Sequence, residues 1–386
     1  MEWFYLNGYN QIMILGIDAS RMSFEASTGV EFYSKHIIAA ILKILKDEND
    51  DEKSGSVEVV LYSPKKLDII FPENEFYKHE ERVIPCPRLW TQARLGYEMF
   101  VNPPDVLFVP SHVIPIFHPK KTVTMIHDVA FKYTKKAYSF ASYHYLNFGA
   151  MFACKFAYKI FTPTEAVKQD LIKFYNCNPK KIVVVHHGFE TPDVPKNVMI
   201  ADEKKILAQF GIGKDQKYIF FVGRLEEKKN LVRLINAFAE FSKKNKDYKL
   251  LLCGKRGLKF KKIWRAVEKN NLWSKVLMPG YITEEEKNIL MKNCDSVAFP
   301  SLQEGFGFPV LEAFYYKKPI VVSDIPALRE IAEDAVVFVD PYNEKNIADG
   351  LKKIKNCEEL IKKGTERLKK FTWKKAAEKT LKVLLS

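Results

Sequence analysis

Residues 297–314 read VAFPSLQEGFGFPVLEAF, and they contain a predicted strand, a loop and the start of a predicted helix. The apolar run at the beginning has the length of a buried strand. The loop GFGF follows, and Pro309 suits the first turn of a helix because its missing N–H is not needed there. A strand that leads through a glycine-containing loop into a helix is typical of a parallel α/β sheet.

The same order of elements is repeated on both sides of this stretch. Helical periods, such as residues 31–45, 231–241 and 343–354, alternate with apolar runs of strand length. The expected strands cover residues 12–17, 57–62, 106–109, 122–126, 159–162, 182–185, 218–222, 249–253, 276–278, 296–300, 319–322 and 335–339. We therefore expect an α/β fold with two Rossmann-like, doubly wound parallel sheets.

The boundary between the two halves is expected near TPDVPK (residues 191–196), which carries two prolines and no periodicity. This gives an N-terminal domain of residues 1–195 and a C-terminal domain of residues 196–371. Two such domains make a cleft between them. Ligands of open parallel sheets bind beyond the carboxyl ends of the strands, so functional residues are expected directly after the strands.

The two ends of the chain carry further signals. Thr372 can cap a final helix in residues 372–386. The apolar face of that helix consists of Ala376, Ala377, Leu381 and Leu384. At the other end, Met13 lies at the start of the first strand, so residues 1–12 are interpreted as an upstream extension.

Composition excludes several classes of protein. The 386 residues are 47% hydrophobic and 28% charged, which excludes a disordered chain. No apolar run approaches the roughly 20 residues that a membrane-spanning helix needs. Glu2 stands where a signal peptide would be basic, so we expect neither secretion nor a membrane anchor. The six cysteines form no CxxC pair, which argues against a zinc framework or a disulfide scaffold and favours the cytoplasm.

The formal net charge is 61 − 47 = +14, and most of the cations are lysines. Such a surface reflects general solvation or an anionic partner, namely membrane lipid, nucleotide phosphate or nucleic acid. Residues 131–161 contain eleven aromatic residues, five lysines and no acidic residue. This segment is interpreted either as a surface for an anionic membrane or as a buried helix whose lysines reach solvent.

Within residues 297–314, Glu304 and Glu312 flank the glycine-containing loop from which the predicted helix begins. Backbone N–H groups and the positive end of the helix dipole at that loop make an anion site suited to a diphosphate. Carboxylates repel phosphate, but they accept hydrogen bonds from sugar hydroxyls. Together these features indicate a sugar nucleotide; a solvent-exposed capping pair around a tight turn is the alternative.

A second cluster follows another strand. In IFFVGRLEEKKN (residues 219–230), the strand ends at Gly223, and Arg224 and Lys229 come next. Both cations would lie beyond the carboxyl end of a strand in the second domain, where they can hold an anion. The alternative for Lys228 and Lys229 is a solvated charge run with Glu226 and Glu227.

Two weaker signals lie in the first domain. His127 ends the strand in TVTMIHDVAF (residues 122–131) and can hydrogen-bond a sugar or acceptor, unless it is a satisfied core or loop histidine. Gly29 stands in a βα turn, where glycine permits close approach of the backbone to a ligand. A plain connection is the alternative there.

Common motifs of other enzymes are absent from the sequence. There is no P-loop, no GxGxxG and no HExxH, and no two aspartates stand at i and i+2. These absences argue against a P-loop NTPase, a standard dehydrogenase and a metal-dependent phosphate enzyme. We expect no metal and no cofactor.

The ordered series of motifs resembles the retaining glycosyltransferases of family 4, which have the GT-B fold. Glu304 and Glu312 match the Glu-x7-Glu signature of that family. Other matching segments are WTQARL (90–95), PPDVLFVPSH (103–112), IHDVAF (126–131), VVVHHGFE (183–190), FVGRLEEKKN (221–230) and SDIPALREI (323–331). The resemblance covers roughly residues 12–386 and is greatest to bacterial mannosyl- and rhamnosyltransferases of surface glycans.

The resemblance implies roles for the residues of the second domain. Arg224 and Lys229, which follow Gly223, match the pair that holds the donor diphosphate, and Glu312 matches the residue that binds the ribose. Glu304 matches the contact to the donor sugar. The resemblance implies that backbone groups also contact the donor sugar, namely those of Gly305, Phe306, Gly307 and Phe308.

The resemblance also extends to the first domain. His127 matches a residue that lines the sugar and acceptor side, and Gly29 matches a loop near the phosphates. Glu31 stands where many relatives have a second glycine, so the donor contact of this loop differs from theirs. The family fold also returns its last helix, here residues 372–386, to the first domain.

The function implied is transfer of a mannose-like hexose, with retention, from a nucleoside-diphosphate sugar to a glycan or lipid-linked acceptor. Arg224, Lys229, Glu304 and His127 are the expected catalytic residues. The expected place is the cytoplasm, at the inner face of the membrane if residues 131–161 bind lipid. A nucleotide-sugar epimerase of the same fold, a phosphorylase with a lysine-bound pyridoxal cofactor and a basic nucleic-acid-binding protein are the alternatives; no nucleic-acid-binding motif supports the last.

Overall fold

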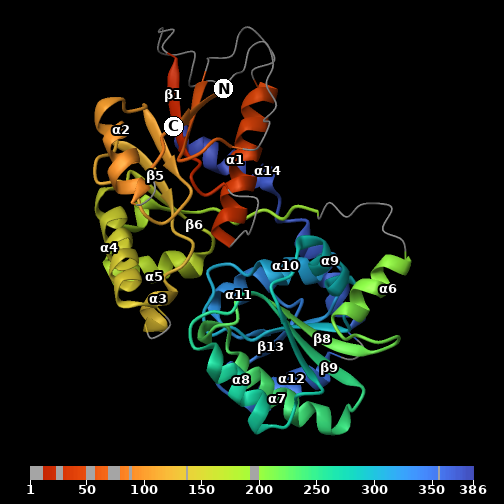
Figure 1. The fold of residues 1–386 in the computed structure, drawn as a ribbon. Helices are drawn as coiled ribbons and strands as arrows, with labels where there is room; N and C mark the ends of the chain where they lie inside the picture. Colours follow the sequence, from red (N-terminus) through yellow and green to blue (C-terminus); the bar gives the residue numbers. More distant parts are fainter. Residues whose placement is uncertain are drawn as a thin grey trace. The chain divides into compact units, whose positions relative to one another are not determined.

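The computed structural model of the chain describes residues 12–22, 29–48, 57–67, 79–86, 89–135, 138–191, 200–354 and 357–386. The chain divides into two compact units, drawn in Figure 1. Unit 1 comprises Met1–Val129, Ala141–Gly188 and Phe371–Ser386, and unit 2 comprises Ala130–Phe140 and Phe189–Lys370.

The expected boundary at residue 195 and residues 1–11 of the expected extension lie outside the described residues. In the structure the chain leaves unit 1 after Gly188. The sequence also places residues 130–140 in the first domain, whereas the structure groups Ala130–Phe140 with unit 2.

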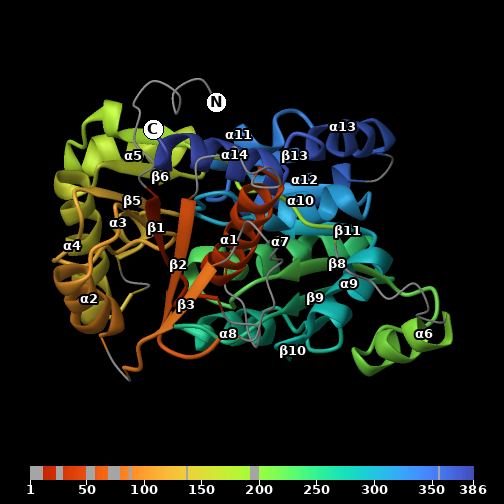
Figure 2. The same cartoon turned by 90° about the horizontal axis from the view of Figure 1, so that it is seen from above.

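The described strands of unit 1 form one parallel sheet in the order β3-β2-β1-β4-β5-β6-β7. Their bounds are β1 Met13–Asp18, β2 Val57–Ser63, β3 His79–Val83, β4 Val106–Val109, β5 Lys121–Met125, β6 Lys159–Thr162 and β7 Ile182–Val184. Figure 2 shows β1, β2 and β3 side by side. All four residues of the central strand β4 are buried, as is typical of a parallel sheet covered on both faces.

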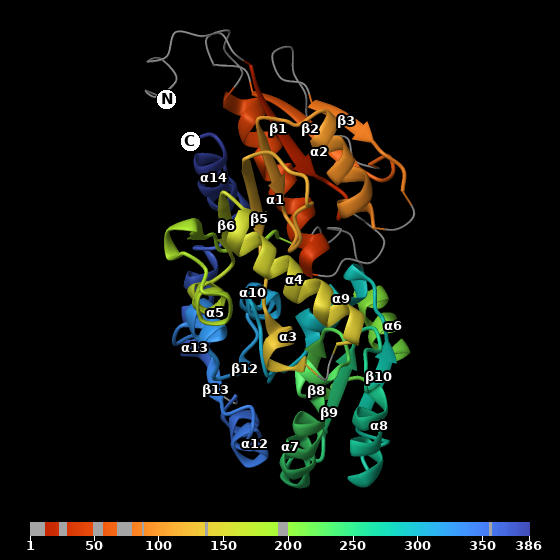
Figure 3. The same cartoon turned by 90° about the vertical axis from the view of Figure 1, so that its left-hand side faces the viewer.

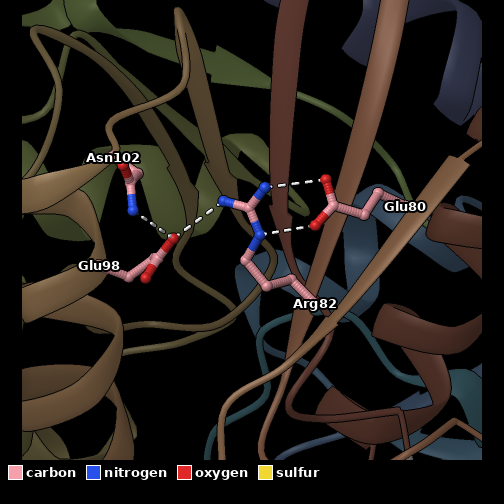
Figure 4. Close-up of polar contacts among 4 residues, drawn as sticks. All are labelled: Glu80, Arg82, Glu98 and Asn102. Atoms are coloured by element: carbon pink, nitrogen blue, oxygen red, sulfur yellow. Dashed lines mark hydrogen bonds and ion pairs between the residues drawn. The ribbon is translucent and has the colours of Figure 1, made fainter.

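The edge strand β3 is not predicted by the sequence, because HEERV contains no apolar run. It pairs with β2 and carries Arg82, whose guanidinium lies between two carboxylates. Arg82 Nε lies 2.7 Å from Glu80 Oε1, and Arg82 Nη1 lies 2.9 Å from Glu98 Oε1 (Figure 4). Charged side chains on an edge strand oppose unwanted strand pairing, and here they also attach α2 (Gly96–Val101) to the sheet.

Helices cover both faces of this sheet. The helices α1 (Gly29–Glu48) and α14 (Trp373–Leu384) pack against each other on one face, and α2 and α4 (Phe140–Phe156) lie over the other (Figure 1 and Figure 3). The remaining helices among the described residues of unit 1 are η2 (Thr91–Leu95), α5 (Glu165–Tyr175) and the 3-10 helix η4 (Pro179–Lys181). The π-helix η2 runs into α2.

The predicted final helix is confirmed in its cap and its apolar face. Thr372 accepts a hydrogen bond from the backbone N of Lys375 at 3.3 Å. The residues predicted to be apolar contacts, Ala376, Ala377, Leu381 and Leu384, are all buried. In unit 1 this helix contacts α1.

The described strands of unit 2 form a second parallel sheet in the order β10-β9-β8-β11-β12-β13. Their bounds are β8 Lys217–Val222, β9 Tyr248–Cys253, β10 Val276–Gly280, β11 Ser296–Phe299, β12 Ile320–Ser323 and β13 Val337–Val339. The prediction of two doubly wound parallel sheets is therefore confirmed. The strand order reverses between β8 and β11, which is the topological switch point of this sheet.

Helices cover the second sheet on both faces as well. On one face α7 (Leu231–Lys244) contacts α8 (Phe260–Lys269) and α12 (Glu344–Lys353), and α9 (Glu284–Asn293) and α10 (Phe308–Tyr315) cover the other (Figure 1). The structure describes five other helices in unit 2, namely α3 (Ala130–Tyr133), α6 (Ile200–Gln209), η5 (Glu227–Lys229), α11 (Pro326–Ala332) and α13 (Glu358–Leu368). Among the described residues, none of the helices is long and apolar enough to cross a membrane.

Candidate functional site

The site in unit 2 begins where β8 and β11 end. The two strands are neighbours in register, with Ile219 opposite Ser296 and Phe220 opposite Val297. Gly223 follows β8 with φ +148°, a backbone conformation that side chains rarely adopt. A Cβ atom built there would lie 3.9 Å from Lys229 Cε, so Gly223 lies beside the Lys229 side chain.

Asn230 fixes the loop that carries Lys229. It has left-handed φ and ψ and stands between η5 and α7. Its Nδ2 donates to the carbonyl oxygen of Pro300 at 3.0 Å and to that of Pro341 at 2.6 Å. The backbone N of Leu302 donates to the carbonyl oxygen of Lys228 at 2.8 Å. These bonds tie the loop after β8 to the loops after β11 and β13.

Lys229 and Glu304 meet directly. Lys229 Nζ lies 2.5 Å from Glu304 Oε1, and the two side chains are only 15% and 9% exposed. Lys229 Nζ also lies 5.0 Å from the centroid of the Phe299 ring. Lys228 is buried too, so these lysines are not the solvated charge run that the sequence left as an alternative.

The helix α10 begins beside Glu304 without a side-chain cap. Gly307 is its N-cap, with φ +108°, and Pro309 stands in its first turn. A Cβ atom at Gly307 would lie 2.6 Å from Leu328 Cδ2, so the chain has no room for a side chain there. The positive end of the α10 dipole therefore points into the same loop that contains Glu304.

Glu312 lies one turn further along α10. Its Oε1 accepts a hydrogen bond from Lys287 Nζ at 2.8 Å. Lys287 comes from α9 and lies 2.6 Å from Glu284 Oε2 as well. Sequence reasoning missed Lys287, because the pair Lys287–Glu312 joins two helices that are separated by β11.

Arg224 is placed differently from Lys229. Its side chain is 60% exposed, and its Nε lies 3.6 Å from Glu226 Oε2. An exposed guanidinium beside Gly223 is available to a ligand, since a surface ion pair of this kind is weak. Unit 2 thus brings together Gly223, Lys229, Glu304 and the start of α10, with Arg224 next to Gly223 in the chain.

His127 lies in unit 1, after β5, and is buried. Its Nε2 lies 3.0 Å from the carbonyl oxygen of Pro110, so Nε2 carries the proton and donates. Nδ1, 3.3 Å from His187 Nε2, then accepts from that residue. Burial lowers the pKa of His127 to about 3, which keeps the ring neutral. Both nitrogens are engaged within unit 1, and a contact of His127 with a sugar stays a prediction.

Gly29 is also in unit 1, where it is the first residue of α1 and is exposed. The turn before it, residues 23–28, lies outside the described residues. Its predicted place near the donor phosphates therefore stays a prediction. The structure describes no cluster of three or more His, Cys, Asp or Glu side chains that could hold a metal ion.

Two family profiles match the sequence. The profile described as "Glycosyl transferases group 1" matches residues 202–371, which is most of unit 2. The profile described as "Glycosyltransferase Family 4" matches residues 56–192, which includes much of unit 1.

Individual proteins are similar over much of the chain. "O-antigen chain mannosyltransferase B" of Escherichia coli is 24% identical over 300 residues, which span 76% of each chain. "O-antigen chain mannosyltransferase RfbU" of Salmonella typhimurium is 27% identical over 252 residues, 65% of each chain. The crystal structure of Anabaena Alr3699/HepE in complex with UDP and glucose matches with a TM-score of 0.66 and 17% identity, covering 97% of this chain and 100% of that one. At that identity the similarity concerns the fold.

Proposed function

Because the chain belongs to glycosyltransferase family 4 and has the GT-B fold, we propose that it transfers a hexose from a nucleoside-diphosphate sugar to an acceptor hydroxyl, with retention at the anomeric carbon. One observation carries the proposal. Lys229 and Glu304 pair at 2.5 Å beside the uncapped start of α10, at the point where the strand order of unit 2 reverses. Such switch points hold nucleotides in doubly wound sheets.

Anion binding is the first task of this site. Lys229, Arg224 and the backbone N–H groups at the start of α10 supply positive charge to the diphosphate. Lys229 is held before the donor arrives, because it pairs with Glu304 and because Asn230 fixes the loop after β8. Preorganised positive charge stabilises the negative charge that grows on the diphosphate in the transition state, and this requires no metal ion.

The chemical step exchanges one C–O bond for another. The bond from the anomeric carbon to the β-phosphate oxygen breaks, and a bond from that carbon to the acceptor oxygen forms on the same face of the sugar. The acceptor proton passes to the departing diphosphate, so no protein base is needed. Glu304 accepts a hydrogen bond from a hydroxyl of the donor sugar, and Glu312 accepts from the ribose.

We propose mannose as the hexose and a cell-surface polysaccharide, free or lipid-linked, as the acceptor. Two relatives named O-antigen chain mannosyltransferases support this choice. The six cysteines, all free thiols, fit a reducing compartment, and we place the reaction in the cytoplasm.

We also propose that the enzyme binds the inner face of the membrane through unit 1. The sequence left residues 131–161 open between a membrane surface and a buried helix, and α4 within them exposes large apolar side chains. The surface extends further, over α2 and the loop of residues 113–118. Its exposed apolar residues are Tyr97, Phe100, Val101, Ile116, Phe117, Phe148, Met151 and Phe156, and we call this set the docking surface.

Contacts within unit 1 make the docking surface continuous. The Phe100 and Phe117 rings lie 5.4 Å apart, which joins α2 to the loop. The His118 and Phe152 rings lie 6.0 Å apart, which joins the loop to α4. The Glu98–Arg82 pair fixes the inner side of α2, so that its other side is exposed (Figure 4).

Charge favours an anionic bilayer as the partner of the docking surface. Lys155 Nζ lies 5.2 Å from the Phe156 ring centroid, and Lys159 Nζ lies 5.8 Å from that of Tyr158. Aromatic and aliphatic residues edged by lysines suit a lipid interface with negative head groups, where each lysine contributes about 1 kcal/mol.

An activity assay tests the proposed reaction. UDP- and GDP-linked hexoses are incubated with oligosaccharide acceptors, and the product is analysed by proton NMR. The expected result is acceptor-dependent release of nucleoside diphosphate and an α-linkage from an α-linked donor. Release of an altered free sugar without acceptor would identify an epimerase. Binding of nucleic acid that weakens steeply with salt and ignores sugar nucleotides would support the basic nucleic-acid-binding alternative.

Vesicle flotation tests the membrane contact. The protein is expected to float with vesicles containing phosphatidylglycerol and not with phosphatidylcholine alone. The F100S/F117S variant should lose flotation, and the matched exposed substitution L258S in unit 2 should keep it. Wild-type protein that stays at the bottom of the gradient with anionic vesicles would refute the docking surface.

A further inference from the structure

Lys287 is a largely enclosed cation next to Glu312, a residue of the candidate site. It lies one turn into α9, which begins with a capping box of Thr283 and Glu286. The Lys287 side chain is only 16% exposed. Its Nζ lies 2.6 Å from Glu284 Oε2 and 2.8 Å from Glu312 Oε1.

The two carboxylates keep Lys287 charged. Burial alone would lower the pKa of Lys287, but Glu312 and Glu284 raise it above the ordinary value of a lysine. A largely enclosed cation held by two anions has little freedom to move, because separating the charges in a poorly solvated place is costly. Lys287 is thus a fixed donor that acts on Glu312 Oε1.

We propose that Lys287 is a positioning residue that holds the Glu312 carboxylate toward the two ribose hydroxyls, so that the enzyme selects ribonucleoside over 2′-deoxyribonucleoside donors. The inference rests on the proposed function and names the class of donor that the same site takes. It assigns to α9 a part in donor recognition that none of the sequence motifs indicates.

The geometry of Glu312 suits two hydroxyl donors. A carboxylate offers two oxygens and about four lone-pair positions, of which Lys287 occupies one. No hydrogen bond to Glu312 Oε2 occurs among the described residues, so that oxygen and the remaining lone pair of Oε1 are available. A glutamate fixed in one rotamer loses less entropy when a ligand binds than a mobile one.

The place of Glu312 along α10 agrees with this role. It stands four residues after Phe308, so it lies about 6 Å along the axis from the helix start. The helix start faces the diphosphate in the proposed function. A ribose is joined to its diphosphate through the 5′ carbon and oxygen, and a separation of one helical turn matches that short link.

Binding titrations test the inference without relying on activity. GDP, UDP, their 2′-deoxy forms and inorganic pyrophosphate are titrated into the wild type and four variants. K287M removes the cation. K287R retains it and serves as the conservative rescue. E284Q neutralises the outer carboxylate, which is 69% exposed, with little risk to folding. K292M is the matched control, since Lys292 on the same helix pairs with Glu203 at 2.6 Å.

The wild type is expected to prefer the ribose form by about tenfold to a hundredfold, the range for a hydrogen bond to a charged group. K287M should reduce that preference to less than about threefold while its pyrophosphate affinity stays unchanged. K287R and K292M should keep the preference, and E284Q should reduce it in part. Equal ribose preference in wild type, K287M and E284Q would overturn the inference. If no nucleoside diphosphate binds the wild type, the proposed function itself fails.

Discussion

Lys229 Nζ and Glu304 Oε1 lie 2.5 Å apart, so the cation assigned to the donor diphosphate is already paired with the acid assigned to the donor sugar. A diphosphate that binds here must share Lys229 with a carboxylate that repels it. The pairing holds Lys229 and Glu304 in place before the donor binds, but the carboxylate weakens the binding of the diphosphate. It also predicts opposite effects on binding and on turnover for one substitution.

Glu304→Gln removes the negative charge but keeps a group that can accept a hydrogen bond. We expect nucleoside diphosphates to bind about two- to tenfold more tightly, because an adjacent like charge is lost and Lys229 is released. Turnover should fall, because the sugar loses its charged acceptor. Calorimetry and a steady-state assay measure the two effects. Weaker diphosphate binding in E304Q would show that Glu304 does not oppose the anion.

Arg224→Ala separates a functional effect from a structural one. The Arg224 side chain is 60% exposed, so its loss should change the free energy of unfolding by no more than about 0.5 kcal/mol. Turnover should fall about 10²–10³-fold if the guanidinium stabilises the departing diphosphate. Lys243→Ala, an exposed lysine on α7, is the control and should leave turnover unchanged. Normal turnover of R224A would remove Arg224 from the site.

Gly307→Ala tests the backbone of the α10 start. At φ +108° and with Leu328 Cδ2 only 2.6 Å from the new Cβ, alanine must strain the loop. We expect a loss of about 1–3 kcal/mol in stability and a loss of donor binding. Gly213→Ala is the matched control, because no atom lies within 4 Å of its Cβ position. Thermal unfolding measures the stability of both variants. Equal melting temperatures of G307A and G213A would show that alanine at position 307 does not strain the loop.

Gly188→Ala tests how the last helix is fastened in unit 1. The new Cβ would lie 2.3 Å from the backbone N of Trp373, which cannot move aside as a side-chain end can. We expect destabilisation of about 1–3 kcal/mol, as in other overpacked sites. Gly96→Ala, whose Cβ would have 3.6 Å to its nearest neighbour, should be nearly neutral in urea unfolding. If G188A is as stable as the wild type, the start of α14 can move to make room for the new Cβ atom.

Acid should destabilise the protein through His127. Its pKa falls from 6.5 to about 3 on folding because the ring is buried. Above about pH 6.5 His127 is neutral in the unfolded chain too, so it does not change the free energy of unfolding with pH. Between about pH 6.5 and 3 only the unfolded chain binds the proton, so the free energy of unfolding falls by about 1.4 kcal/mol per pH unit. Urea unfolding at pH 7.5 and 5.0 should show a smaller drop for His127→Gln than for the wild type.

Much of the fold could be predicted because both sheets are parallel and buried. Strand β4 is apolar along its length, and β8 is apolar after Lys217 and leads to the helical period of α7. The edge strand β3 could not be predicted, since its pattern is charged and its stability comes from pairing with β2. An apolar run in the sequence indicates a buried strand, and β3 is mostly not buried.

The candidate site was predictable where a residue directly follows a strand. Lys229 and Glu304 stand in the loops after β8 and β11, and Glu312 lies one turn into α10. Their roles toward a sugar nucleotide stay predictions. Lys287 could not be predicted, because its pair with Glu312 depends on how α9 and α10 pack. The two hydrogen-bond partners of His127, on Pro110 and His187, are long-range for the same reason.

The central claim is that Lys229 holds a nucleoside diphosphate. It is tested most directly by titrating GDP and UDP into the wild type, K229A and the exposed-lysine control K243A at one pH and salt concentration. We predict saturable binding of one nucleotide to the wild type and K243A, and at least tenfold weaker binding to K229A, about 1.4 kcal/mol or more. Equal affinity of all three proteins for the nucleotide, or no binding to any of them, would contradict the account.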